Sequence, residues 1–296
     1  MLPTWLWLLL VVALLAVAWC LATSVFGLSV STAPLDPIVA FTWSYRMTPA
    51  QLHCIRIAFA VIFVVFLGYD MYTEWQGGFW FIYLTHWALF VQTVYMVMLA
   101  LVSNRMMKDR AQKQYEGLMM HSNSDSFFEE PLIVKVYMVL NAITLPLCMI
   151  VTIIYWTALN PIWKICVFND QEQDCNPFPA GTSVFKHFFN TVLVTLMFLD
   201  GAIPFHFRNA GWVIIFCGVY GIWTIIHYFL KIGNSNGCPK LGYPTNECPI
   251  YNIINWHRPA LTLIIIGGLT IVLAPLVNLS CVGFATIRDE SRTMIK

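Results

Sequence analysis

The stretch Val184–Phe205 reads VFKHFFNTVLVTLMFLDGAIPF, and it decides how the rest of the chain is interpreted. At a rise of about 1.5 Å per residue, a helix of this length crosses a bilayer. It nevertheless carries Lys186, His187, Asn190 and Asp200. An ionisable group in hydrocarbon costs at least about 2.5–3.5 kcal/mol, so such groups normally face a bundle interior, a partner or a wet cavity. We therefore interpret this helix as the polar spine of a membrane helix bundle.

The composition is typical of a polytopic membrane protein. Of the 296 residues, 59% are hydrophobic and only 10% are charged, and the mean hydropathy is +0.70. Soluble domains have about 45–50% apolar and about 25% charged residues. The formal net charge is +1. A nucleic-acid-binding protein needs a strongly basic surface, so nucleic acid is excluded as a partner.

Seven apolar segments have roughly the length of a transmembrane helix. They predict an all-α, seven-helix membrane bundle. We expect an extra N-terminal transmembrane helix in residues 1–30, a six-helix membrane domain in residues 31–285 and a cytoplasmic tail in residues 286–296. The first segment lacks a positive n-region, so we prefer a retained helix to a signal peptide. The segments are Leu2–Val30, Leu52–Thr73, Phe79–Ser103, Leu132–Thr157, Val184–Phe205, Gly211–Lys231 and Ala260–Val282.

The basic residues predict the orientation of the bundle. Placing Asn104–Pro131 in the cytoplasm puts eleven of the 16 Lys and Arg residues on that side, which is a positive-inside bias. The amino terminus then lies outside or in a lumen, and the carboxyl terminus lies in the cytoplasm. The membrane is the plasma membrane or an endomembrane.

Four of the nine cysteines fall in two loops that the same rule places outside. Disulfides persist outside the cytoplasm, so these loops are predicted to be disulfide-bonded. The local pairs Cys166–Cys175 and Cys238–Cys248 are the simplest of the three connectivities. Two alternatives stay open: disulfides that join one loop to the other, and free thiols.

Polar side chains from several predicted helices share one depth, in the outer third of the bundle. Bundles assemble sites from such facing side chains. His187 and Asn190 share a helix face because they are three residues apart. Thr85 and His86 are adjacent and diverge by about 100° around their helix, so at most one points straight into a pocket. The layer comprises Asp70, Thr85, His86, His187, Asn190 and His227, with Trp256 and His257 at its rim.

Three interpretations of this polar layer stay open. In a hydrolase, Thr85 is the nucleophile, His187 or His227 the base, and the Asn190 amide an oxyanion donor. In a metal site, the three histidines bind an ion together with Asp70. No H-x-x-x-H or H-E-x-x-H spacing is present, so we predict no metal and no cofactor. In the third interpretation, the polar groups only join helices by hydrogen bonds, at roughly 0.6 kcal/mol each. The ligand-binding candidates are Asp70, His86, Trp256 and His257.

Three strings follow one another along successive predicted helices. They are Leu132-Ile-Val-Lys-Val-Tyr-Met-Val-Leu-Asn141 with Ile154-Tyr-Trp156, His187-x-x-Asn190 followed by Asp200 and Pro204, and Tyr251-x-x-x-Asn255-Trp256-x-x-Pro259. In this order they resemble the rolling stone family of multi-pass membrane proteins. The resemblance covers roughly residues 41–279 and leaves the first helix as an addition. It implies a polar cleft that binds a membrane lipid or a protein partner, in membrane adhesion or fusion.

Leu84-Thr85…Gln92 and Pro146…Trp156 are similar to motifs of a more distant family, the androgen-induced six-helix membrane hydrolases. Those enzymes cleave esters between fatty acids and hydroxy fatty acids, which implies Thr85 as the nucleophile. They carry His-x-x-His with the second histidine catalytic, whereas this chain has Asn190 there. An amide is not a usable base. We therefore expect a lipid- or partner-binding protein first, and an intramembrane lipid-ester hydrolase using Thr85 as the alternative.

Overall fold

The computed structural model describes residues 37–44, 46–119, 132–159, 181–234 and 242–293. Regular secondary structure in these ranges is helical, and no strand occurs in them. A single isolated β-bridge, between Tyr251 and Ile254, lies in the loop before the last span. The all-α prediction is therefore confirmed for the described part of the chain.

Within the described ranges, six helices are long and apolar enough to cross a membrane, which is the pattern of a multi-pass membrane protein. The predicted seventh, Leu2–Val30, falls outside the described residues. The spans are built from α3 (Pro49–Glu74), α4 (Leu84–Met119), α5 (Leu132–Ile154) with its π-helical continuation η3 (Tyr155–Leu159), α6 (Gly181–Val184) with η4 (Phe185–Phe189) and α7 (Asn190–Asp200), η5 (Phe207–Asn209) with α8 (Ala210–Phe229), and α9 (Pro259–Gly267) with η8 (Gly268–Leu273) and α10 (Ala274–Thr293).

Several helix ends differ from the sequence prediction. The predicted span Phe79–Ser103 begins at Leu84, because Gln76–Ile82 forms the short 3₁₀ segment η2. Gly77 and Gly78 in η2 adopt φ values of 70° and 96°, a left-handed conformation that breaks an α-helix and suits glycine. The span opening at Val184 begins instead at Gly181 and ends at Asp200.

Two helices run beyond the predicted membrane boundary. α4 continues to Met119 through part of the predicted loop Asn104–Pro131, and α10 continues to Thr293 through the predicted tail. Both extensions are rich in residues with good helix propensity, so the helix does not end where the hydrophobic pattern ends. A short additional helix, α2 (Pro37–Thr42), precedes the first described span and packs against α4.

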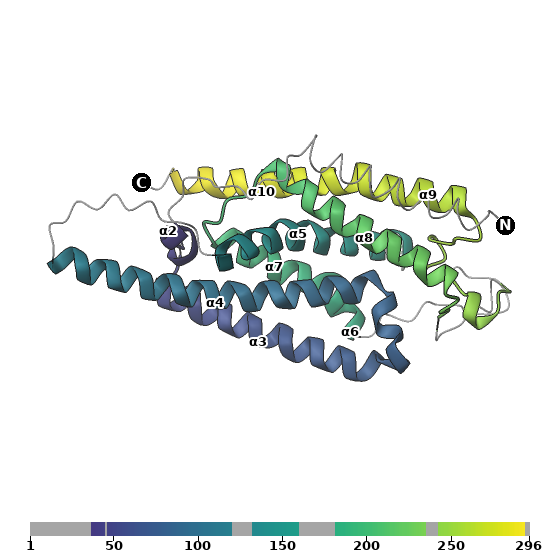
Figure 1. Cartoon of the computed structure of the whole chain (residues 1–296). Helices are drawn as coiled ribbons and strands as arrows, with labels where there is room; N and C mark the ends of the chain where they lie inside the picture. The colour runs from purple at the N-terminus through teal and green to yellow at the C-terminus, as the bar shows by residue number, and fades with distance from the viewer. Residues whose placement is uncertain (1–36, 45, 120–131, 160–180, 235–241, 294–296) are drawn as a thin grey trace, which may run out of the picture.

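Helix α5 occupies the centre of the bundle. It contacts α4, α7, α8 and α10. In the most apolar 18-residue stretch of this span, 61% of the residues are buried. In the corresponding stretches of α3 and of the last span, only 22% and 17% of the residues are buried. These helices therefore form two outer edges of the bundle (Figure 1). α3 lies along α4 at one edge, and α9 and α10 run along the other.

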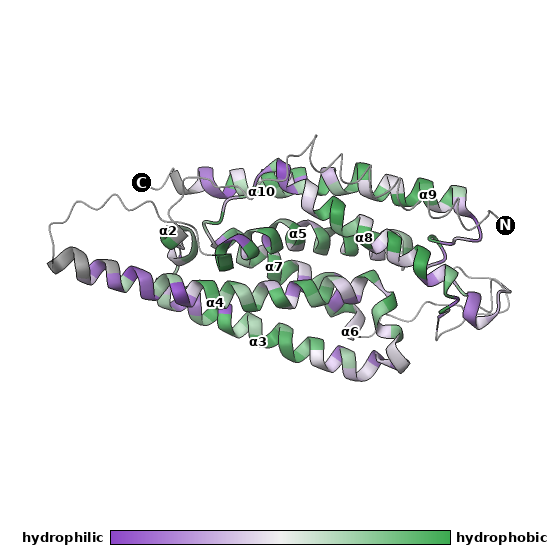
Figure 2. Ribbon diagram, in the orientation of Figure 1, coloured by the Kyte–Doolittle hydropathy of each residue, from purple (hydrophilic) through white to green (hydrophobic). Residues whose placement is uncertain are grey.

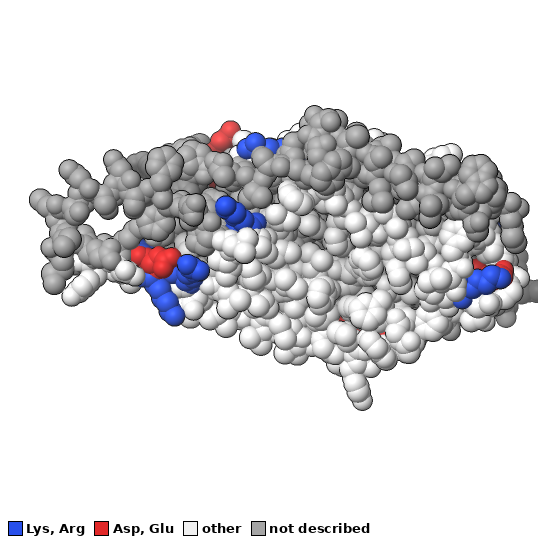
Figure 3. Space-filling view, viewed as in Figure 1, with Lys and Arg blue, Asp and Glu red and all other residues white. Residues whose placement is uncertain are grey.

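The surface has the charge distribution of a bundle surrounded by lipid. Figure 2 shows the helices predominantly hydrophobic along their middle, with hydrophilic residues concentrated toward α10 and the far end of α4. On the face seen in Figure 3, Lys and Arg side chains show in the left half and at the right end, and the surface between them is mainly uncharged. Apolar residues of the spans such as Val65, Ile264 and Leu279 are exposed on the outside of the bundle, where a bilayer would cover them.

The predicted site residues lie toward one end of the bundle, which we call the site end. It is the end where Glu74, Leu84, His187 and Phe229 lie, at the right in Figure 1. A loop through residues 242–258 covers part of this end, and its position depends on Gly233. Gly233 has φ +77°, and a Cβ there would lie 2.1 Å from the carbonyl oxygen of Thr245.

We expect the substitution Gly233→Ala to destabilise the protein by displacing this loop. The left-handed conformation alone costs an alanine about 1–2 kcal/mol, and the clash with the Thr245 backbone adds to it. Gly242→Ala is the matched control, because Gly242 has φ +69° but a Cβ added there would meet nothing within 4 Å. Thermal unfolding in detergent should give a larger drop in Tm for Gly233→Ala. Equal drops for the two variants would contradict the steric argument.

Candidate functional site

Thr85 and His187 are in contact at the site end. Thr85 is the second residue of α4, and His187 lies in the π-helical turn η4. The Thr85 Oγ1 atom is 3.2 Å from His187 Nε2, across 102 residues of sequence. The sequence placed both residues at one depth, and the structure brings their side chains within hydrogen-bond distance.

The imidazole of His187 is held in one orientation. Its Nδ1 lies 2.6 Å from the carbonyl oxygen of Ser183. A carbonyl oxygen only accepts hydrogen bonds, so Nδ1 carries the proton and donates it. In the neutral ring the lone pair is then on Nε2, which faces the Thr85 hydroxyl. The ring of Tyr155 stacks on the imidazole at a centroid distance of 3.5 Å and an interplanar angle of 10°.

Two π-helical turns surround this histidine. One is η4, which contains His187 itself, and the other is η3, which contains Tyr155 and Trp156. Trp156 Nε1 donates to the carbonyl oxygen of His187 at 3.1 Å and so ties the two turns together. Such π turns occur frequently at functional sites, because they re-aim side chains that a regular helix would place elsewhere.

A buried ion-pair cluster adjoins the Thr85–His187 pair. Lys186 Nζ lies 2.9 Å from Asp70 Oδ1 and 2.7 Å from Glu74 Oε1. Asp70 is completely buried, and its other oxygen accepts a hydrogen bond of 2.8 Å from Trp80 Nε1. The cluster therefore joins η4 to the end of α3 and to η2.

His86 completes this ion-pair cluster. Its Nδ1 donates to the carbonyl oxygen of Trp80 at 2.6 Å, and its ring stacks on Trp80. Its Nε2 lies 3.1 Å from Glu74 Oε2 and 3.5 Å from Asp70 Oδ2. His86 and Thr85 thus point to different neighbours, as expected for adjacent residues of a helix. Lys186 was not among the predicted site residues, although a lone lysine in an apolar span signals a buried acidic partner.

The histidines do not form a common metal site among the described residues. His86 and His187 line one cleft, whereas His227 lies elsewhere. A different set, Asp70, Glu74 and His86, offers ligand atoms within 4.8 Å of one another. The ammonium of Lys186 lies between the two carboxylates of that set and supplies the positive charge there.

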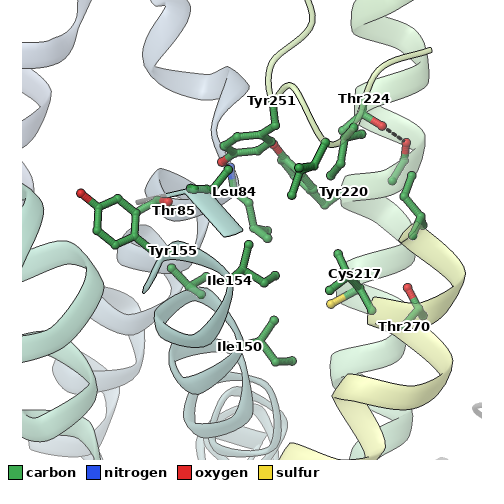
Figure 4. Close-up of a pocket in the computed structure, with 17 residues that line it drawn as sticks. Leu84, Thr85, Ile150, Ile154, Tyr155, Cys217, Tyr220, Thr224, Tyr251 and Thr270 are labelled. Atoms are coloured by element: carbon green, nitrogen blue, oxygen red, sulfur yellow. Dashed lines mark hydrogen bonds between the residues drawn. The ribbon is translucent and has the colours of Figure 1, made fainter. Parts of the chain in front are cut away.

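Two cavities meet at Thr85. An open polar cleft of about 530 Å³ is lined by Glu74, Tyr83, His86, Ser183, Lys186 and His187, among others. An apolar pocket of about 50 Å³ lies between α5, α8 and the last span and includes Ile150, Ile154 and Cys217 (Figure 4). The residues that line both cavities are Thr85, Tyr155, Leu159 and Tyr251. The Thr85 hydroxyl therefore lies on the boundary between polar and apolar space.

Tyr251 is a site residue that sequence reasoning missed. It comes from the loop before α9, and its hydroxyl accepts a hydrogen bond of 3.0 Å from the Leu84 backbone N–H. In Figure 4 its ring lies over Leu84 and Thr85 at the start of α4. Burial raises the pKa of Tyr251 to about 12, so the hydroxyl keeps its proton at neutral pH. The sequence signal was the Tyr251-x-x-x-Asn255-Trp256 string, which by itself indicates only the opening of the last helix.

The predicted oxyanion role of Asn190 is not supported by its position. Asn190 is 1% exposed, and its Nδ2 donates to Gln92 Oε1 at 2.9 Å. Its Oδ1 accepts from the Thr191 backbone N–H at 2.6 Å. Among the described residues Asn190 lines neither cavity. It lies about one turn further along the helix than His187, where it joins the spans instead of facing Thr85.

The predicted site residues His227, Trp256 and His257 lie together in a different place. The His227 Nε2–H donates to the carbonyl oxygen of Gly233 at 2.6 Å. Trp256 Nε1 donates to Thr224 Oγ1 at 3.0 Å, and the His257 ring stacks on Tyr243 at 4.1 Å. These contacts hold the loop to α8, and no described contact joins the three residues to Thr85. His227 and Trp256 line a separate cavity, because the position of a residue in the sequence does not fix its direction around the bundle.

The predicted disulfides stay predictions. Cys166, Cys175 and Cys238 lie outside the described residues, and Cys248 is buried in the loop before α9.

Comparison of this chain with protein families, with curated proteins and with solved structures finds no match. The functional argument therefore depends on the geometry of the site and on the sequence resemblances described above.

We expect Lys186→Met to destabilise the protein strongly, because it leaves the fully buried Asp70 without its cation. Breaking a buried ion pair from one side costs about 3–5 kcal/mol. The double variant Asp70→Asn with Lys186→Met should recover much of that loss, since no unpaired charge remains. Unfolding midpoints in detergent measure both effects.

Lys231→Met is the matched control for this prediction. Lys231 makes an ion pair with Glu247 at the same 2.7 Å distance as that between Lys186 and Glu74, but its side chain is 61% exposed. Exposed pairs contribute little to stability. A loss of stability as large for Lys231→Met as for Lys186→Met would show that burial is not the cause.

Proposed function

We propose that this protein is an intramembrane ester hydrolase that acts on a lipid, with Thr85 as the nucleophile and His187 as the general base. One observation carries the proposal. Thr85 Oγ1 lies 3.2 Å from the Nε2 atom of an imidazole whose Nδ1–H is fixed on the Ser183 carbonyl oxygen at 2.6 Å. A weak hydroxyl nucleophile needs a base within hydrogen-bond distance, and that base needs a group that orients it. The Thr85–His187–Ser183 arrangement has all three parts.

The reaction follows from these positions. Thr85 Oγ attacks the ester carbonyl carbon while His187 Nε2 accepts the hydroxyl proton. The bond between the carbonyl carbon and the alcohol oxygen then breaks, and the alcohol leaves with the proton from His187. A water molecule attacks the acyl group on Thr85, gives one proton to His187, and releases the fatty acid. Threonine and histidine return to their starting states.

The surroundings of Thr85 support the same reaction. The buried Tyr251 hydroxyl lies beside the start of α4 and is protonated at neutral pH, so it is a donor for the oxyanion. The apolar pocket of Ile150, Ile154 and Cys217 suits the first methylene groups of an acyl chain, and the polar cleft suits the alcohol part of the ester. The ester bond then lies at the boundary, next to Thr85.

The proposal changes the order of the two functions expected from the sequence. Asn190 stands where the androgen-induced hydrolases carry their catalytic histidine. Because an amide is not a base, the sequence favoured lipid or partner binding over hydrolysis. His187, three residues earlier on the same helix, is the histidine that contacts Thr85 here. A base is therefore available without a histidine at position 190.

The second candidate is lipid or partner binding without turnover, in a rolling stone-like protein of membrane adhesion or fusion. The junction of an apolar pocket with a polar cleft is compatible with it, because a lipid could bind there without being cleaved. With either function we propose the same topology. It has seven transmembrane helices, an external amino terminus, a cytoplasmic carboxyl terminus and disulfides in the two external loops.

We expect Thr85→Ala to abolish both esterase activity and labelling by a fluorophosphonate probe. Loss of a nucleophile should lower kcat by at least about 10³-fold. His187→Ala should lower it by about 10²–10⁴-fold, the usual contribution of a general base. Thr85→Ser should keep measurable activity because a hydroxyl remains. The readouts are hydrolysis of a fatty-acid ester by the purified chain in detergent and in-gel fluorescence of the probe.

Thr93→Ala is the control for these variants. Thr93 is a buried threonine on the same helix, and its hydroxyl donates to the Leu89 carbonyl oxygen at 2.8 Å, away from both cavities. Its activity per folded protein should match the wild type. If the wild-type chain neither hydrolyses the ester nor labels with the probe, yet co-purifies with lipid, the binding function replaces the hydrolase.

A further inference from the structure

The charges that line the polar cleft are unequally exposed. The side chain of Lys186 is 5% exposed and that of His86 is 4% exposed, whereas that of Glu74 is 36% exposed. The carboxylate of Glu74 is therefore the charged group of the ion-pair cluster that faces the open space of the cleft. The lysine ammonium is enclosed between Asp70 and Glu74.

The Glu74 carboxylate keeps hydrogen-bond capacity for a ligand. Each Glu74 oxygen has one partner, Oε1 with Lys186 and Oε2 with His86. A carboxylate has about four lone-pair sites, so Glu74 keeps acceptor capacity toward the cleft.

Aromatic rings line the same cleft. They are the side chains of Phe79, Tyr83, Tyr155 and Tyr251, and they come from η2, its junction with α4, η3 and the loop before α9. The negative face of an aromatic ring attracts a cation, and cages of aromatic rings bind quaternary ammonium groups. Rings and carboxylate thus favour the same kind of ligand.

An anionic head group fits this cleft poorly. It would face the exposed carboxylate of Glu74, and its natural partner, Lys186, already binds two carboxylates. Recruiting Lys186 to the ligand would leave the fully buried Asp70 without a cation.

Building on the proposed hydrolase, we propose that the substrate is a fatty acyl ester whose alcohol part carries a positively charged amine, quaternary or protonated. The first methylene groups of the acyl chain occupy the apolar pocket, the ester lies at Thr85, and the cationic head binds Glu74 and the rings of the cleft. The head lies in the same cavity as the reacting hydroxyl, because Glu74 and Thr85 both line the polar cleft. The expected substrates are therefore esters of short amino alcohols.

Binding of non-cleavable probes tests the head-group preference directly. Isothermal titration of the purified full chain, in a non-ionic detergent, would compare hexyltrimethylammonium with hexanoate and hexanol. We expect hexyltrimethylammonium to bind at least about tenfold more tightly than hexanoate, and more tightly than hexanol. Equal affinities, or tighter binding of hexanoate, would overturn the proposal.

Two variants of cleft-lining residues test whether the cation binds in the polar cleft. Glu74→Gln should weaken hexyltrimethylammonium binding at least about fivefold and leave hexanol binding unchanged. Phe79→Leu should weaken it without altering the ion-pair cluster, which keeps the test informative if Glu74→Gln folds poorly. Glu247→Gln is the control, because Glu247 is a carboxylate that lines a separate cavity and pairs with exposed Lys231. A drop in affinity for Glu247→Gln equal to that for Glu74→Gln would place the cation elsewhere.

The outcomes separate this proposal from the hydrolase itself. Thr85→Ala should bind hexyltrimethylammonium as the wild type does, because binding of the head does not use the hydroxyl. If the wild type hydrolyses esters but shows no preference for the cation, the head-group proposal fails and the hydrolase stands. If it binds the cation and hydrolyses no amino-alcohol ester, the binding site stands and the hydrolase fails.

Discussion

A lysine ammonium in an apolar helix bundle requires counter-charges, and the site end of this protein is built around that requirement. Lys186 binds Asp70 and Glu74, which lie at the end of α3, more than a hundred residues earlier in the chain. This ion-pair cluster fixes the π-helical turn η4 against α3 and η2. Because His187 is the next residue, the same contacts help to place its ring against Thr85 of α4. The constraint on a buried charge thus positions the histidine.

The position of Thr85 at the junction of two cavities gives the site its chemical character. A hydroxyl inside an apolar pocket would meet only acyl chain, and one in open water would meet no lipid. Here Thr85, Tyr155 and Tyr251 line both the polar cleft and the apolar pocket, so an amphiphile can place its ester between them. The loop before α9 takes part in this arrangement through Tyr251, which receives a hydrogen bond from the first residue of α4.

The predicted site residues that lie away from Thr85 do so for one physical reason. Sequence position predicts the depth of a residue in a bundle, but its direction depends on how each helix is rotated against its neighbours. Asn190 lies about one turn from His187, yet it donates a hydrogen bond to Gln92 and lines neither cavity. His227 and Trp256 share the end of the bundle with Thr85, but their contacts go to Gly233 and Thr224.

The sequence alone determined the helical membrane class, the six apolar spans of the described chain, and the common depth of Thr85 and His187. These features follow from local hydrophobic runs and from the cost of placing polar groups in lipid. The tertiary structure decided which polar groups meet: Lys186 with Asp70, His187 with Thr85, and Tyr251 with Leu84. Such pairs are separated by many residues, and helix rotation and two π-helical turns select them, so no pattern along the chain encodes them directly.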